Sequence, residues 1–70
     1  MEASTRLNGS DLRLIRLARD VRQSDLARAW GCTRQNVARV EGSRRLTTRA
    51  VAAYMAALAS AELASAEAER

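Results

Sequence analysis

Apolar side chains recur every three or four residues in four stretches of the chain, which is the spacing of a buried helical face. Three glycines, Gly9, Gly31 and Gly42, separate or border these stretches. The chain has no proline, and its β-branched residues are scattered, so little in the pattern favours strands. The sequence therefore predicts an all-α domain of four to five helices.

Two short helices in the middle of the chain carry the clearest signals. The first is predicted over Gln23–Trp30 and ends at Gly31, the residue type that best tolerates a left-handed conformation after a helix. The second is predicted over Arg34–Glu41, with Thr33 as its N-cap. Helices this short are not stable alone, so they must pack against each other. Apolar residues suited to that packing are Ala27, Trp30, Cys32, Val37 and Val40.

A longer helix is predicted on each side of this pair. The preceding one covers residues 10–19, with Ser10 or Asn8 as its N-cap. The following one begins near Thr47 and buries a stripe that ends at Leu58.

The apolar stripe does not continue cleanly past residue 59. Leu63 lies about 140° around the helix from Leu58. The tail is therefore a frayed extension, a short fifth helix or a disordered segment, and we favour a helical tail with few contacts. The resulting division is a flexible arm over residues 1–7, a folded domain over 8–59 and an acidic, alanine-rich tail over 60–70.

Charge adds a hint about partners. The net charge is +4, and all 12 basic residues are arginine. Residues 1–50 hold 11 of these arginines and only five of the eight acidic residues. A basic body of this kind suits a polyanion, although a solvated cationic surface explains the charge alone equally well.

Several kinds of function are not expected. The chain has no histidine and one cysteine, which rules out an internal disulfide, a Cys/His zinc site and a histidine base. No nucleophile–base pair or phosphate-binding loop is present, so we expect neither an enzyme nor a cofactor or small-molecule ligand. No membrane-spanning run or signal peptide is found, and we expect a cytoplasmic protein.

The outward face of the second short helix carries side chains that match base edges. Arginine can make a bidentate contact to guanine, and glutamine or asparagine can do the same to adenine. The candidates for reading bases are Arg34, Gln35, Asn36 and Arg39. The alternative is an ordinary polar helix face.

From about Leu12 to Leu58 the chain resembles the helix-turn-helix domain of phage Cro and lambda-type repressors, the XRE-type regulators. The matching positions are Ile15, Arg16, Gln23, Leu26, Ala27, Gly31, Thr33, Val37, Val40 and Glu41. The resemblance implies a lambda-repressor-like fold and a regulator that occupies an operator in double-stranded DNA at the nucleoid, in a phage or prophage switch. It also implies a homodimer, formed either free or only on DNA.

The resemblance assigns roles to further residues. It implies phosphate contacts by Gln23 and by the loop after the recognition helix, and a structural ion pair between Arg16 and Glu41. The start of the helix predicted over Arg34–Glu41 adds Thr33, and the uncapped start of the helix predicted over Gln23–Trp30 adds Arg22. The candidate phosphate contacts are therefore Arg22, Gln23, Thr33, Ser43, Arg44 and Arg45. The chain departs from the family in two places: Gly42 directly follows Glu41, and Arg22 replaces the usual serine or threonine cap.

Two other functions remain open at this point. An antitoxin or a restriction-modification controller would share the fold and also bind DNA. A protein-interaction module that has lost DNA binding would share the fold alone, but the intact basic face argues against it.

Overall fold

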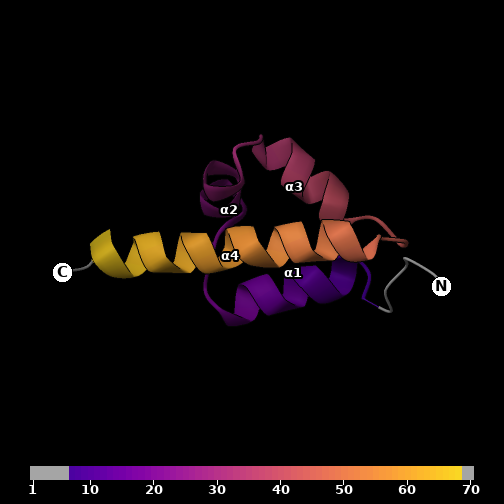
Figure 1. The fold of residues 1–70 in the computed structure, drawn as a ribbon, viewed down its shortest axis with the longest axis horizontal. Coiled ribbons are helices and arrows are strands. Elements are labelled where there is room, and N and C mark those ends of the chain that lie inside the picture. The colour runs from indigo at the N-terminus through magenta and orange to yellow at the C-terminus, as the bar shows by residue number, and fades with distance from the viewer. Residues whose placement is uncertain (1–6, 69–70) are drawn as a thin grey trace.

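The computed structural model describes residues 7–68, which form four helices and no β-strand (Figure 1). These are α1 (Gly9–Ala18), α2 (Gln23–Trp30), α3 (Arg34–Glu41) and α4 (Thr48–Ala68). The all-α class is confirmed, and α2 and α3 have the bounds that the sequence predicts. Helix α1 begins and ends one residue earlier than predicted.

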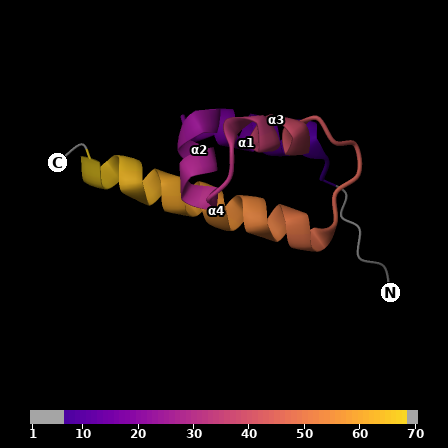
Figure 2. The same cartoon turned by 90° about the horizontal axis from the view of Figure 1, so that it is seen from above.

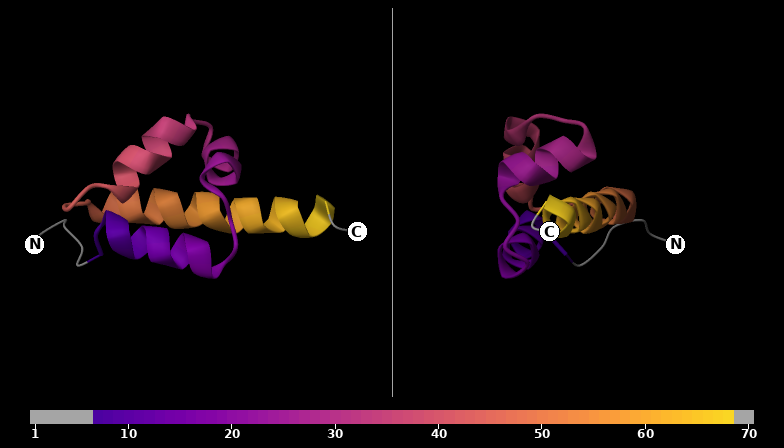
Figure 3. Two further views of the ribbon diagram at one scale, coloured as in Figure 1. Left: turned by 180° about the vertical axis from the view of Figure 1, so that it is seen from behind. Right: turned by 90° about the vertical axis from the view of Figure 1, so that its left-hand side faces the viewer.

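Helix α4 forms the long axis on which the other three helices pack. In Figure 1, α2 and α3 lie on one flank of α4 and α1 lies on the opposite flank. Figure 2, seen from above, shows all three on the same side of α4. The view down the long axis in Figure 3 agrees, because α4 stands at one side of the bundle there. One side of α4 is therefore covered and the opposite side is not.

The core lies where the four helices meet. Each helix contributes at least one side chain with no solvent exposure: Leu12, Leu26, Val37, Tyr54 and Leu58. The ring of Trp30 is half-buried and packs edge-on against Tyr54, with ring centroids 5.7 Å apart and an interplanar angle of 87°. Such an arrangement is a favourable aromatic geometry. Tyr54 is thus a core residue of the domain.

Side-chain caps fix where the helices begin. Asn8, and not Ser10, caps α1: its Oδ1 accepts a hydrogen bond from the Asp11 amide, and an Asp11 carboxylate oxygen accepts one from the Asn8 amide, each at 3.0 Å. This reciprocal pair is a capping box. Thr33 and Thr47 cap α3 and α4, each accepting from the amide three residues later. Helix α2 has no side-chain cap, as the arginine at position 22 predicts.

Gly9 has a role that the sequence does not reveal. It is the first residue of α1 and lies against the end of α3, where its amide donates to the Ser43 carbonyl at 2.8 Å. A Cβ at this position would collide with backbone atoms of Val40 and Glu41. Gly42, in contrast, has a φ of −93° and room for a Cβ, so its conformation does not require glycine.

The tail expected at residues 60–70 continues α4 without a break as far as Ala68. Its first turn is anchored, because Ala61 is buried and Glu62 pairs with Arg19 at 3.1 Å. Residues 63–68 are exposed. Most of the expected arm, residues 1–6, lies outside the described residues, as do residues 69 and 70, whereas Leu7 packs against the core. Within the described chain, no helix is long and apolar enough to cross a membrane.

Candidate nucleic-acid interface

A tight turn joins α2 to α3 and sets the angle between them. Gly31 has a φ of +78°, in the left-handed region that glycine adopts without a steric cost. The amides of Gly31 and Cys32 both donate to the Ala27 carbonyl, at 2.9 and 3.0 Å. Leu26, Ala27 and Val37 are buried where the two helices pack. The outward face of α3 is therefore held by a rigid pair of helices.

The four predicted base-reading residues lie together on that face. Arg34, Gln35 and Arg39 are exposed, and Asn36 is half-buried. Arg39 Nη2 donates to Asn36 Oδ1 at 2.6 Å, so the oxygen of the Asn36 amide faces Arg39. The face thus combines two cations with two amide side chains.

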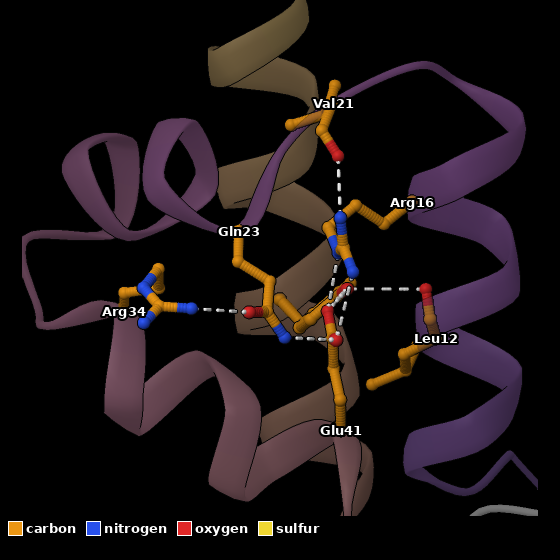
Figure 4. A network of polar contacts seen from close by, with 7 residues as sticks. Leu12, Arg16, Val21, Gln23, Arg34 and Glu41 are labelled. Carbon is orange, nitrogen blue, oxygen red and sulfur yellow. Dashed lines mark hydrogen bonds and ion pairs between the residues drawn. The ribbon is translucent and has the colours of Figure 1, made fainter.

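Gln23, at the start of α2, links this face to the interior (Figure 4). Its Nε2 donates to Glu41 Oε1 at 3.0 Å, and its Oε1 accepts from Arg34 Nη1 at 3.4 Å. Because the carboxylate only accepts hydrogen bonds, it fixes which end of the Gln23 amide faces Arg34. Gln23 therefore donates one of its two amide hydrogens to Glu41. Only the other amide hydrogen is available for a hydrogen bond to a DNA phosphate.

The predicted pair of Arg16 and Glu41 is present and buried. Arg16 Nε donates to Glu41 Oε2 at 2.7 Å and Nη2 to Oε1 at 3.2 Å. Arg16 Nη1 also donates to the Val21 carbonyl at 2.7 Å. Their side chains are 6% and 2% exposed, so water screens this pair very little. The pair holds the end of α3 and the α1–α2 turn in fixed positions.

Tyr54 completes this buried network from α4. Its hydroxyl lies 2.5 Å from Glu41 Oε2 and 3.2 Å from the Leu12 carbonyl. A hydroxyl donates one proton, and the shorter distance and the charge favour donation to Glu41. No buried side-chain nitrogen or oxygen in the described chain lacks a hydrogen-bond partner.

The network shifts the pKa of each of its ionisable groups. Burial raises the pKa of the Glu41 carboxyl, but hydrogen bonds from Arg16, Tyr54 and Gln23 outweigh burial and hold that pKa below its usual value of 4.5. The hydrogen bond to Glu41 raises the pKa of Arg16. Burial, and then the hydrogen bond to Glu41, raise the pKa of Tyr54. At neutral pH the carboxylate is ionised and the phenol is neutral.

The predicted phosphate contacts are distributed around the two ends of α3. Thr33 uses its hydroxyl oxygen as the α3 cap, and its hydroxyl proton remains a donor. Arg44 and Arg45 are exposed in the loop after α3. The Ser43 hydroxyl donates to the Arg39 carbonyl at 3.1 Å, so its only proton is already in use. Arg22 is exposed and pairs with Asp25 at 3.3 Å.

A shallow depression joins α1 to the start of α2 and α3, and two of its residues, Arg13 and Ser24, are not among the candidates from the sequence. Arg13, which the sequence suggests is plain surface charge, lies there. No acidic residue lines the depression: its lining is Arg13, Arg16, Arg22, Gln23, Ser24 and Arg34. The only signal in the sequence was that Arg13 lies one helical turn before Arg16. Arg16 is neutralised by Glu41, but the three exposed arginines around the concavity, Arg13, Arg22 and Arg34, favour an anionic ligand.

No protein-family model, curated protein or solved structure matches the chain.

Proposed function

We propose that the protein binds double-stranded DNA sequence-specifically, with α3 in the major groove, and regulates transcription by occupying an operator. The observation that carries the proposal is the outward face of α3. The inward face of α3 is buried, while Arg34, Gln35 and Arg39 are exposed on its outward face. The major groove of DNA is wide enough to hold a helix in this way.

Charge around this face supports the proposal. Arg13 and Arg22 flank the start of α2 and α3, and Arg44 and Arg45 follow the end of α3. A duplex seated on α3 would have its phosphates near both groups. Phosphate contacts at two ends of a base-reading helix fix its register on the duplex.

The geometry also supports preorganisation. Arg34 is hydrogen-bonded to Gln23, which is itself held by the buried carboxylate of Glu41. A base-reading side chain that is already oriented loses less conformational entropy on binding.

The proposal is tested by selecting binding sequences from a random duplex library with the full chain. We expect an enriched motif, and binding to that motif that resists an excess of random duplex. Failure to enrich any motif, with equally weak binding to all sequences, would overturn the proposal.

A matched pair of variants assigns the binding to α3. Arg34→Ala and Arg28→Ala each remove one exposed arginine, but Arg28 lies at the other end of α2, beside the C-terminal part of α4. We expect Arg34→Ala to weaken binding to the motif and Arg28→Ala to leave it nearly unchanged. Equal effects would show that only net charge matters.

A further inference from the structure

The uncovered side of α4 carries a regular apolar seam. Its residues recur at alternating spacings of four and three, the spacing of a coiled-coil seam. They are all exposed: Ala52, Ala56, Ala59, Leu63 and Ala66. Leu63 is the most exposed large apolar residue of the described chain, at 62%.

The described helices leave this seam exposed, and only Ala56 borders a shallow depression that it shares with Ala29 and Trp30 of α2. Helices α1, α2 and α3 all lie on the other side of α4 (Figures 2 and 3). The helix also runs beyond the core, since residues 63–68 are exposed. An exposed apolar row of this kind on an extended helix is typical of a surface that packs against another helix.

We propose that this seam pairs with the same seam of a second copy of the chain, with the two α4 helices antiparallel. When Ala56 of one copy lies opposite Ala59 of the other, Leu63 of each copy meets Ala52 of the other. The central layers are then small enough for close approach, and each large side chain fits over a small one. The seam is therefore complementary to itself under a two-fold rotation.

Charges at the two ends of the seam select the antiparallel orientation. Arg49 and Glu67 are exposed, and neither has an ion-pair partner among residues 7–68. Antiparallel pairing brings Arg49 of each copy beside Glu67 of the other, at both ends. Parallel pairing would instead place the two Arg49 side chains together, which is repulsive.

The resulting dimer has a shape that deepens the proposed function. Its two-fold axis is perpendicular to α4 and runs from α1 towards α2 and α3, vertically in Figure 1. Rotation about that axis keeps the α2–α3 pairs of both copies on one face of the dimer. Only this consequence rests on the proposed DNA binding, because the pairing itself requires no DNA.

The interface is small, so the free dimer is weak. The seam spans about 22 Å of helix at 1.5 Å per residue. That is less than a standard stable interface, and we expect a dissociation constant on the order of 10 to 100 µM.

Sedimentation equilibrium of the full chain, without DNA, tests the pairing. We expect Leu63→Glu to weaken dimerisation at least about 100-fold, because each dimer loses two buried leucines. Leu14→Glu is the matched control, since Leu14 is 61% exposed on α1, outside the seam. It should leave dimerisation unchanged. A protein that stays monomeric up to about 1 mM, or equal effects of the two variants, would overturn the proposal.

Charge exchange tests the orientation and does not depend on the leucine variant. Arg49→Glu or Glu67→Arg alone should weaken the dimer by roughly 3- to 10-fold, and the double variant should regain the original affinity. Both single changes suit the helix dipole at their ends of α4, so they do not threaten folding. A double variant no better than either single one would contradict antiparallel pairing. These measurements can fail while sequence-specific binding by α3 persists, and the reverse also holds.

Discussion

Gly9 and Gly42 lie in the same junction between α1 and α3, but a methyl group would meet different surroundings at each. At Gly9 it would overlap backbone atoms of Val40 and Glu41, which cannot rotate away. At Gly42 its nearest neighbours would be backbone oxygens at 3.5 and 3.6 Å, an ordinary contact. The two positions therefore form a matched pair.

We predict that Gly9→Ala lowers the free energy of unfolding by about 3 kcal/mol, the cost of forcing extra volume into a packed site. Gly42→Ala should change the free energy of unfolding by less than about 1 kcal/mol. Any reduction in the conformational entropy of the unfolded chain would make this change stabilising. Urea unfolding followed by far-ultraviolet circular dichroism measures both. Similar values for the two variants would show that α1 does not rest against the end of α3.

The Glu41 carboxylate makes a specific prediction about acid stability. Its pKa is lower in the folded chain than the usual 4.5, so ionisation of Glu41 stabilises the fold above that pH. This contribution should be lost as the pH falls from 4.5 through the lower folded-state pKa.

Glu41→Gln should remove this part of the pH dependence and cost about 3 kcal/mol at neutral pH, because Arg16 stays buried without its counter-ion. Glu62→Gln, which alters a half-exposed ion pair, is the control and should keep the wild-type acid profile. Unfolding free energies measured between neutral pH and the acid range give the comparison. An unchanged acid profile in Glu41→Gln would contradict the buried network.

Two exposed arginines near α3 are predicted to differ in what they recognise. If Arg34 reads a guanine, Arg34→Ala should weaken binding to the selected sequence by about 1–3 kcal/mol, with little effect on random duplex. Arg44→Ala should weaken binding to the selected sequence and to random duplex equally, because the phosphate backbone is chemically the same in both. Binding titrations with both duplexes at one salt concentration test the pair. A selective loss in Arg44→Ala would show that the two roles are reversed.

At the scale of elements, α4 has an anchored part and a free part. Ala61 is buried and Glu62 pairs with Arg19, whereas the side chains of residues 63–68 are exposed. Ending the chain after Glu62 should lower the unfolding free energy by less than about 1 kcal/mol. Ending it after Ala59 should cost about 1–2 kcal/mol more, because the buried Ala61 is lost. Equal stabilities of the two truncated chains would place the boundary at residue 59, as the sequence suggests.

The elements that the sequence predicts best are those with local signals. The bounds of α2 and α3 are predicted correctly because Gly31 ends α2 and Thr33 caps α3 through contacts with nearby residues in the sequence. The pair of Arg16 and Glu41 was identified by resemblance, and its burial confirms it as structural.

The features that sequence reasoning missed depend on contacts between distant segments. Three features require the packed structure: the close approach of Gly9 to α3, the hydrogen bond of Gln23 to Glu41, and the depression that Arg13 shares with Arg34. The sequence left the continuity of α4 open for another reason. Its apolar stripe shifts around the helix after Leu58, and small alanines still make the contact at Ala61.

At the scale of the whole molecule, the two proposed binding surfaces are separate. The outward face of α3 carries the proposed base-reading residues, and the uncovered side of α4 carries the proposed dimer seam. The buried network of Arg16, Glu41 and Tyr54 lies between them and connects α1, α3 and α4. DNA and a second copy of the chain would therefore bind without competing for the same residues.

The central claim is that α3 is the surface that contacts DNA, and a nuclear magnetic resonance titration tests it most directly. The backbone amide signals of the full chain would be followed while a duplex carrying the selected motif is added. We predict the largest changes in residues 33–39 and 43–45, with a second set at the start of α2. Small changes there, together with large changes confined to other surfaces of the domain or no change anywhere, would contradict the account.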